Sequence, residues 1–116
     1  MKNNIVAFKS KVFALRCIRL YKYLVSEKKE YVMSKQLLRS GTSIGANIKE
    51  ALRGQSKSDF YAKLNISLKE ASETEYWLEL LNESGYIENN FFEGIYSECQ
   101  EIISLLVAIT KHQKEQ

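Results

Sequence analysis

The sequence predicts an all-α protein in which four helices form a single domain, residues 1–116. The chain contains no proline and five glycines among 116 residues, so few of its residues interrupt helices. Apolar residues recur at spacings of three and four, which is typical of amphipathic helices. Short polar breaks divide this pattern into four segments, residues 4–26, 34–53, 57–84 and 90–113. A domain of this length can bury an ordinary core without disulfides or metals.

The first segment, 4–26, carries two apolar stripes. The first stripe, predicted to face the core, consists of Val6, Phe13, Cys17, Leu20 and Leu24. A helix in an isolated four-helix bundle needs to bury one such stripe. The second stripe therefore predicts contact between subunits, and its residues are Ile5, Phe8, Val12 and Leu15.

The same segment is basic, with no acidic residue before Glu27. Lys9 and Arg16 follow Lys2 at seven-residue intervals, between the two apolar stripes. This pattern is typical of a solvated face whose long side chains cover apolar surface, but it also suits a surface that binds phosphates. Our candidates for nucleic-acid binding in the first two helices are Lys9, Lys11, Arg16, Arg19, Lys22, Lys35 and Arg39.

The second segment, 34–53, places small and polar residues at helical spacing. Ser34 is a candidate N-cap and Gly54 a candidate C-terminal glycine. Glycine costs about 1 kcal/mol relative to alanine inside a helix, so two glycines one turn apart predict close approach of a neighbouring helix. The polar residues would either satisfy one another across a helix contact and fix its register, or contact a ligand. The predicted packing motif is Ser40, Gly41, Ser43, Gly45, Asn47 and Glu50.

The last two segments show clear start signals and a wide apolar surface. Ser56 with Asp59 three residues later has the character of a capping box. Asn90 is the expected cap of the segment 90–113, with Glu93 as its partner. We expect Tyr61, Tyr76 and Trp77 to lie outside the core stripe of their helix. Residues beside the stripe of the last helix widen it, so Leu105 is a further candidate for the subunit interface.

No residue pattern in the chain indicates catalysis, a cofactor or a metal site. A bundle that binds two irons needs Glu-x-x-His pairs on two helices, and this sequence has one histidine, His112. Cys17 and Cys99 lack metal-ligand spacing and are interpreted as core thiols of a reducing compartment. The acidic cluster Glu70, Glu73 and Glu75 fits pairing with Lys or Arg of a neighbouring helix better than cation binding. With no secretory signal and no membrane-spanning run, we expect a cytoplasmic, non-enzymatic protein.

Charge is distributed unevenly along the chain. Residues 1–69 hold 15 of the 17 Lys and Arg but 4 of the 14 Asp and Glu, a net charge of +11, whereas residues 70–116 carry −8. Such asymmetry indicates either a surface for polyanions or helices of opposite charge that pack side by side.

The sequence resembles the four-helix-bundle proteins related to 23S rRNA intervening-sequence proteins. The resemblance is strongest over residues 36–51, QLLRSGTSIGANIKEA, and continues through SDF at 58–60 and LNISLKEA at 64–71. Ala51 to Gly54 departs from the pattern, because many relatives place a glycine directly after the Asn-Ile-x-Glu element. This resemblance implies an antiparallel up-down bundle that assembles into a ring of five subunits. It also implies a link with nucleic acid, because the family includes members encoded within rRNA insertions and the accessory variability protein of diversity-generating retroelements, which works with a reverse transcriptase and nucleic acid.

Two main hypotheses follow for function. The first is a non-enzymatic homo-oligomer whose basic helices bind RNA or DNA phosphates, and the second is a protein-interaction scaffold with a partner such as a reverse transcriptase. If the basic side chains converge on one open surface, the first is favoured. If they face the acidic residues between Glu70 and Glu101 of a neighbouring subunit, the second is favoured. An enzyme would require a deep pocket with convergent polar groups near Asn47 and Glu50.

Overall fold

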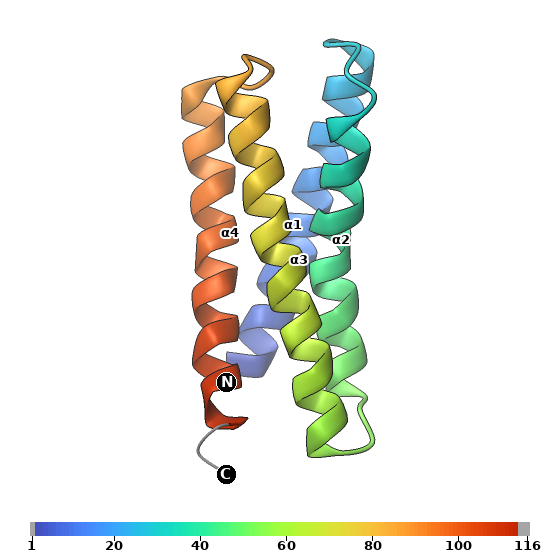
Figure 1. Cartoon of the computed structure of the whole chain (residues 1–116), viewed down its shortest axis with the longest axis vertical. Helices are drawn as coiled ribbons and strands as arrows, with labels where there is room; N and C mark the ends of the chain where they lie inside the picture. The colour runs from blue at the N-terminus through green and yellow to red at the C-terminus, as the bar shows by residue number, and fades with distance from the viewer. Residues whose placement is uncertain (1, 114–116) are drawn as a thin grey trace.

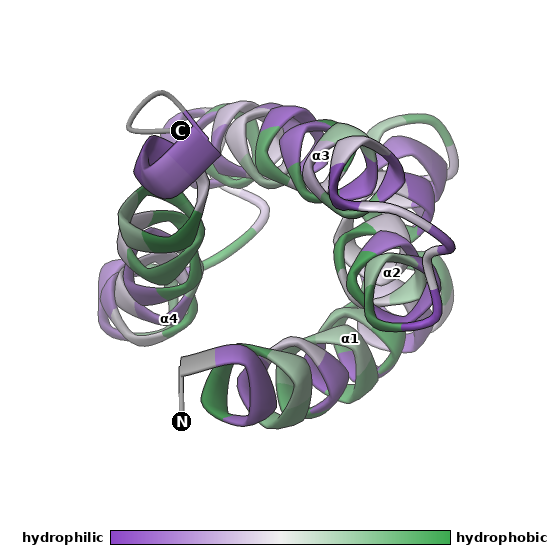
Figure 2. Cartoon of the chain, turned by 90° about the horizontal axis from the view of Figure 1, so that it is seen from below, coloured by the Kyte–Doolittle hydropathy of each residue, from purple (hydrophilic) through white to green (hydrophobic). Residues whose placement is uncertain are grey.

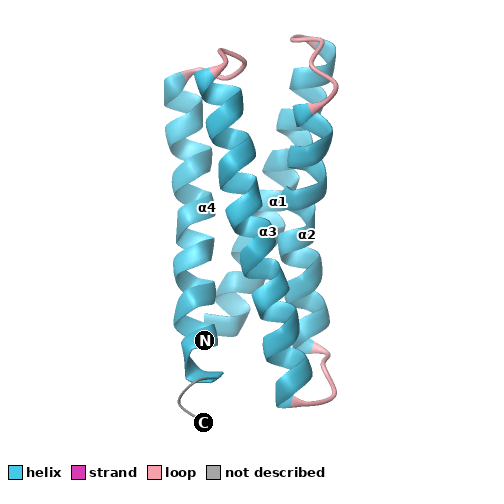
Figure 3. Ribbon diagram, viewed as in Figure 1, coloured by secondary structure: helices cyan, strands magenta, loops and turns pink. Residues whose placement is uncertain are grey.

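The computed structural model describes residues 2–113, which form four α-helices in antiparallel, up-down order followed by a short 3₁₀ turn (Figures 1 and 3). The helices are α1 (Lys2–Ser26), α2 (Met33–Leu52), α3 (Lys57–Glu83) and α4 (Asn89–Thr110), and the turn is η1 (Lys111–Gln113). The described residues contain no strand. The all-helical fold class with four helices is therefore confirmed.

The helices surround one core in the order α1, α2, α3, α4 (Figure 2). The molecule is elongated, with principal extents of 47 × 21 × 19 Å. Each helix contributes a stripe at three- and four-residue spacing, so the α1 residues predicted to face the core are all buried. The largest fully buried side chains include Phe13, Leu24, Leu37, Ile44, Leu64, Leu78, Ile95 and Ile102.

Helices α1 and α2 approach closely at the two glycines of α2. A Cβ atom added at Gly41 would lie 2.5 Å from the Cys17 Sγ atom, and one added at Gly45 would lie 3.2 Å from the Ser10 Oγ atom. Larger residues at either position would push the helices apart. The two glycines therefore fix the separation of α1 and α2.

The start of α2 differs from the sequence prediction. Ser34 is not the N-cap; Val32 occupies that position and makes no side-chain capping bond. Instead the buried carboxylate of Glu30 accepts hydrogen bonds from the backbone amides of Val32 (3.1 Å), Met33 (3.0 Å) and Ser34 (2.7 Å). The Ser34 hydroxyl donates to the Glu30 carbonyl at 2.8 Å. Glu30 thus satisfies the free amides of the first turn from outside the helix.

Two predicted details of the second half are wrong, and one is confirmed. Helix α4 begins at Asn89 after Glu88, which makes no side-chain capping bond, so Asn90 is not its cap. Tyr61 is buried rather than exposed, and its ring packs edge-on against Phe60 with centroids 5.1 Å apart. Ser56 caps α3 as expected, since its hydroxyl accepts from the Asp59 amide at 3.0 Å.

Candidate nucleic-acid interface

The second apolar stripe of α1 lies on the surface of the molecule. Ile5, Phe8, Val12 and Leu15 are 45%, 69%, 40% and 48% exposed. These four residues form the outer apolar stripe. Leu105 of α4 instead packs against the core and is half-buried, whereas Val107 is 47% exposed. A continuous apolar strip on one helix is unusual for an isolated soluble protein and typical of an interaction site.

Two of the predicted cations on α1 bind acids of α4. Lys9 Nζ lies 3.2 Å from Glu101 Oε2, and the Arg16 guanidinium pairs with Glu98. The Arg16 guanidinium carbon also lies 5.1 Å from the centroid of the Phe91 ring, a cation–π arrangement. Lys9 and Arg16 therefore join α1 to α4.

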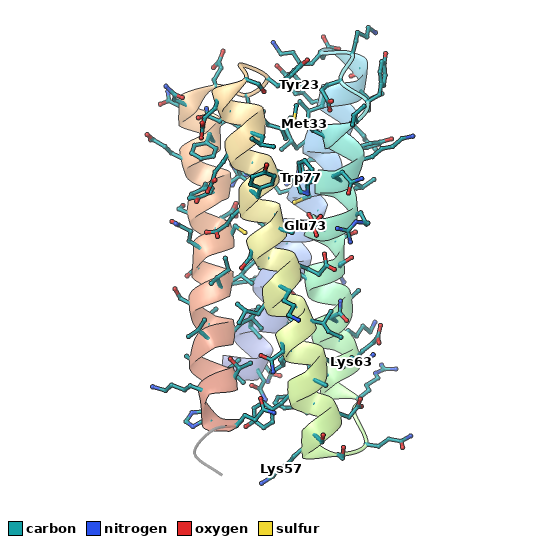
Figure 4. All side chains as sticks on the ribbon, in the orientation of Figure 1. Tyr23, Met33, Lys57, Lys63, Glu73 and Trp77 are labelled. Carbon is teal, nitrogen blue, oxygen red and sulfur yellow. The ribbon has the colours of Figure 1, made fainter. Side chains whose placement is uncertain are left out.

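Arg39 of α2 is paired in the same way with α3. Its guanidinium lies 3.2 Å from Glu70 Oε1 and also binds Glu73, and the hydrogen bond to Glu73 contributes most to raising the Arg39 pKa. The Trp77 indole donates to Glu73 at 2.9 Å, and this bond together with Arg39 lowers the pKa of Glu73 (Figure 4). Glu70 and Glu73 thus both pair with a basic residue, Arg39, of the neighbouring helix.

The remaining four candidates, Lys11, Arg19, Lys22 and Lys35, are exposed. Among residues 2–113 none of them forms an ion pair. Two further exposed cations that the sequence analysis did not single out, Lys49 and Arg53, share the outer side of α2 with Lys35. At 100° per residue, Lys35, Lys49 and the position of Arg53, which directly follows α2, fall within an arc of about 40°. Position on the helical wheel could have identified both residues before the structure was known.

Five of these six unpaired cations lie on the outer surface of α1 and α2, whereas Arg19 lies on the side of α1 that carries the outer apolar stripe. Lys11 and Lys22 differ by about 20° around α1, on the side opposite the core. The outer apolar stripe is centred about 70° away from them, toward α4. We call this set the α1–α2 basic face, and it consists of Lys11, Lys22, Lys35, Lys49 and Arg53.

The polar residues of the α2 motif make mainly structural contacts. Ser40 is buried and accepts a hydrogen bond from the Thr74 hydroxyl of α3 at 2.9 Å. Ser43 and Asn47 donate to carbonyls of their own helix, Arg39 O and Ser43 O. Glu50 is exposed and lies 3.0 Å from Lys63 Nζ, and this contact raises the Lys63 pKa. The hydroxyl of Ser67 of α3, which the sequence analysis did not single out, donates a hydrogen bond to the Ile44 carbonyl of α2 at 2.8 Å.

The two cysteines lie in the core. Burial raises the pKa of Cys17 to about 12 and also raises that of Cys99, so both thiols are protonated at neutral pH. Within residues 2–113, no group of three or more His, Cys, Asp or Glu side chains could hold a metal ion. The helices of this part of the chain are also too short or too polar to cross a membrane.

The chain is similar in sequence to a known protein family and in structure to a solved protein. The model of the 23S rRNA-intervening sequence protein family matches residues 2–108. A crystal structure from Bacteroides thetaiotaomicron, of a protein with unknown function from the S23 ribosomal protein family, is 59% identical and has a TM-score of 0.95. The alignment covers 96% of this chain and 99% of that one. No curated protein matches the chain.

Proposed function

Because the chain belongs to the 23S rRNA-intervening sequence protein family, we propose that it is a non-enzymatic, homo-oligomeric helical bundle that binds RNA or DNA. Binding takes place on the α1–α2 basic face and is directed at the phosphate backbone. The observation that carries this proposal is the position of the five cations of that face. They are exposed on two adjacent helices and form no ion pair with another described residue.

Electrostatics explains why three of the seven candidates from the sequence are not part of this face. Lys9, Arg16 and Arg39 already face carboxylates of the same chain, so a phosphate would have to compete with those acids. The unpaired cations can neutralise phosphates and release condensed counterions, which supplies most of the affinity of non-specific binding. Contacts of this kind position a nucleic acid but do not read its sequence.

Self-association follows from the outer apolar stripe. We propose that a second copy of the chain covers Ile5, Phe8, Val12 and Leu15, because burial of exposed apolar area stabilises association by roughly 25 cal/mol per Å² before the costs of binding. Assembly would repeat the basic face in every subunit. Several weak phosphate contacts would then act together on one nucleic acid.

The proposal is tested by charge reversal at matched positions. Fluorescence anisotropy would measure binding of labelled RNA and DNA to the wild type and to the double variant Lys11→Glu/Lys22→Glu at low salt. We expect the double variant to lose at least about tenfold in affinity, since two phosphate contacts become repulsive. The control Lys69→Glu/Lys111→Glu changes the net charge equally on α3 and η1 and should bind nearly as well as the wild type. Equal losses in both variants would contradict the proposal.

A protein-interaction scaffold is the second candidate function. It is favoured by the ion pairs of Lys9, Arg16 and Arg39 with acids of α3 and α4, because these pairs neutralise three of the seven predicted nucleic-acid-binding cations within the chain. On this alternative the outer apolar stripe and the basic face bind an acidic protein partner. Absence of nucleic-acid binding by the wild type at low salt would favour the scaffold.

A further inference from the structure

A cleft of about 380 Å³ opens between the C-terminal half of α1 and the start of α4. Its base is apolar, formed by Leu20 and Ile87, which are both buried. Its volume falls within the range of roughly 300–1,000 Å³ that is usual for small-molecule sites. The residues around it are Arg16, Arg19, Tyr23, Glu88 and Phe91.

Two aromatic side chains stand at the cleft from different elements. Tyr23 of α1 is 43% exposed and Phe91 of α4 is 37% exposed, and Tyr23 lies at the end of the bundle where α1 meets the α1–α2 loop (Figure 4). Arg16 lies over the Phe91 ring and is bound to Glu98, so it orients the ring while its charge is balanced. Exposed aromatic rings around an apolar base are the usual platform for unstacked bases.

The charged groups of the cleft are arranged for two different parts of one ligand. Arg19 lies one helical turn before Tyr23, is exposed and forms no ion pair with another described residue, so it can bind an anion. Glu88 carries a carboxylate at the same cleft, which accepts hydrogen bonds and repels phosphate. A nucleotide combines the two required properties, an anionic phosphate and a flat base with amino donors on its edge.

We propose that this cleft binds one unpaired nucleotide of a single strand, with its base stacked on Tyr23 and Phe91. In this arrangement Arg19 binds the adjoining phosphate, and Glu88 accepts a hydrogen bond from the edge of the base. The inference rests on the proposed nucleic-acid function and deepens it. The α1–α2 basic face would bind any strand or duplex through phosphates, whereas the cleft would favour unpaired segments.

The test compares single strands with duplexes for a variant that retains charge and apolar volume. Anisotropy titrations would use a 12-nucleotide single-stranded RNA, the same sequence as DNA, and a blunt duplex. For Tyr23→Leu/Phe91→Leu we expect a loss of about tenfold or more on single strands, because base stacking on aromatic side chains is lost. Duplex affinity should stay within about twofold, because no phosphate contact is removed. RNA and DNA single strands that lose affinity alike show that the base, rather than the 2′-hydroxyl, is recognised.

Two controls distinguish stacking in the cleft from stacking elsewhere on the surface and from self-association. Tyr76→Leu/Tyr31→Leu removes two exposed aromatic rings that lie outside both the cleft and the outer apolar stripe, on α3 and in the loop before α2, and should leave single-strand binding unchanged. Size-exclusion chromatography of each variant tests whether the cleft instead lies between copies of the chain. A change of oligomeric state in Tyr23→Leu/Phe91→Leu would overturn the proposal, as would an equal loss in the control.

A measurement on the unmodified protein covers the case in which the variants fold poorly. A single-stranded RNA that contains 4-thiouridine would be irradiated with the wild type, and the crosslinked peptides mapped by mass spectrometry. We expect crosslinks at Tyr23 or Phe91. Crosslinks that map only to the α1–α2 basic face would overturn the proposed nucleotide site in the cleft but would leave the proposed nucleic-acid function intact. Absence of binding by any strand or duplex would contradict both.

Discussion

Glu30 illustrates how a single buried carboxylate organises the first turn of a helix. Burial by itself raises the pKa of this group, but the amides of Met33, Ser34 and Val32 together bring the pKa below its ordinary value of 4.5. The folded state therefore favours the charged form of Glu30 more than the unfolded state does. By linkage, this stabilisation is complete above the ordinary pKa and is lost as the pH falls through the lower pKa of the folded protein.

We predict that Glu30→Gln destabilises the protein by about 1–2 kcal/mol at pH 7, because one amide oxygen replaces two charged acceptors. The difference from the wild type should narrow as the pH falls below 4.5, because Glu30 then becomes protonated in the unfolded chain, and it should be smallest below the lower pKa of folded Glu30. Urea unfolding monitored by circular dichroism at pH 7, 5, 4 and 3, at one fixed protein concentration, measures both effects. A difference that is the same at pH 7 and pH 3 would contradict this role of the Glu30 charge.

Gly41 illustrates steric control at the contact of α1 with α2. Alanine is the better helix former by about 1 kcal/mol, but its Cβ would lie 2.5 Å from Cys17 Sγ. We predict that Gly41→Ala is destabilising overall by about 1–3 kcal/mol, as is typical of overpacking. Gly45→Ala should cost less, because its Cβ would lie 3.2 Å from the Ser10 hydroxyl oxygen.

A double-mutant cycle checks the cause of this effect. Cys17→Ala removes the sulfur atom, so the cost of Gly41→Ala should be smaller in that background. Urea unfolding of the four proteins gives the coupling energy. If Gly41→Ala has the same cost with and without Cys17, the clash with the sulfur is not the reason for the glycine.

At the scale of the element, α1 is distinguished by its two apolar sides. One side supplies the core, and the other is the outer apolar stripe, which includes Phe8 at 69% exposure. Two acidic residues on this stripe would need to be desolvated in any interface that covers it. We therefore predict that Phe8→Glu/Val12→Glu dissociates the proposed oligomer while the helical circular dichroism signal is retained.

Sedimentation velocity of the wild type and the variant measures the change. The variant Asn4→Glu/Lys11→Glu is the control, because it places two acids on exposed positions of the same helix outside the stripe. It should sediment like the wild type. A wild type that sediments as a monomer, or a variant that remains an oligomer, would exclude the stripe as the subunit interface.

The sequence was most informative about the helices and their buried sides. Spacing of apolar residues identified all four helices, because a core stripe is a local property of each helix. The glycine pair of α2 indicated a close helix contact because glycine is unfavourable inside a helix unless a neighbour approaches closely. The start of α2 was not predictable in this way. Glu30, whose carboxylate binds the free amides of the first turn, precedes the N-cap position Val32 and is not one of the usual capping residues.

At the scale of the whole molecule, the two halves of the chain meet along two seams. The basic helices α1 and α2 pack beside the acidic helices α4 and α3, and the ion pairs of Lys9, Arg16 and Arg39 lie across these contacts. The charge asymmetry was visible in the sequence, but the pairing was not. Which cations are neutralised depends on contacts between residues 31 to 92 positions apart.

The cleft could not be predicted from the sequence for a related reason. Its residues come from positions 16–23 of α1 and 87–91 around the start of α4, and neither segment has a local motif. In the sequence, neither Tyr23 nor Phe91 belongs to a recognisable binding motif. Their relationship becomes visible once the antiparallel fold brings the two segments to the same end of the bundle (Figure 1).

The salt dependence of binding tests most directly whether the α1–α2 basic face binds nucleic-acid phosphates. The affinity of the wild type and of Lys11→Gln/Lys22→Gln/Lys35→Gln for one duplex would be measured from about 25 to about 200 mM salt. For the wild type, the logarithm of affinity should fall steeply with the logarithm of salt concentration. The variant should bind more weakly, with a slope reduced by about 0.9 for each lost phosphate contact. An unchanged slope in the variant, or no binding by the wild type at the lowest salt, would contradict phosphate binding on this face.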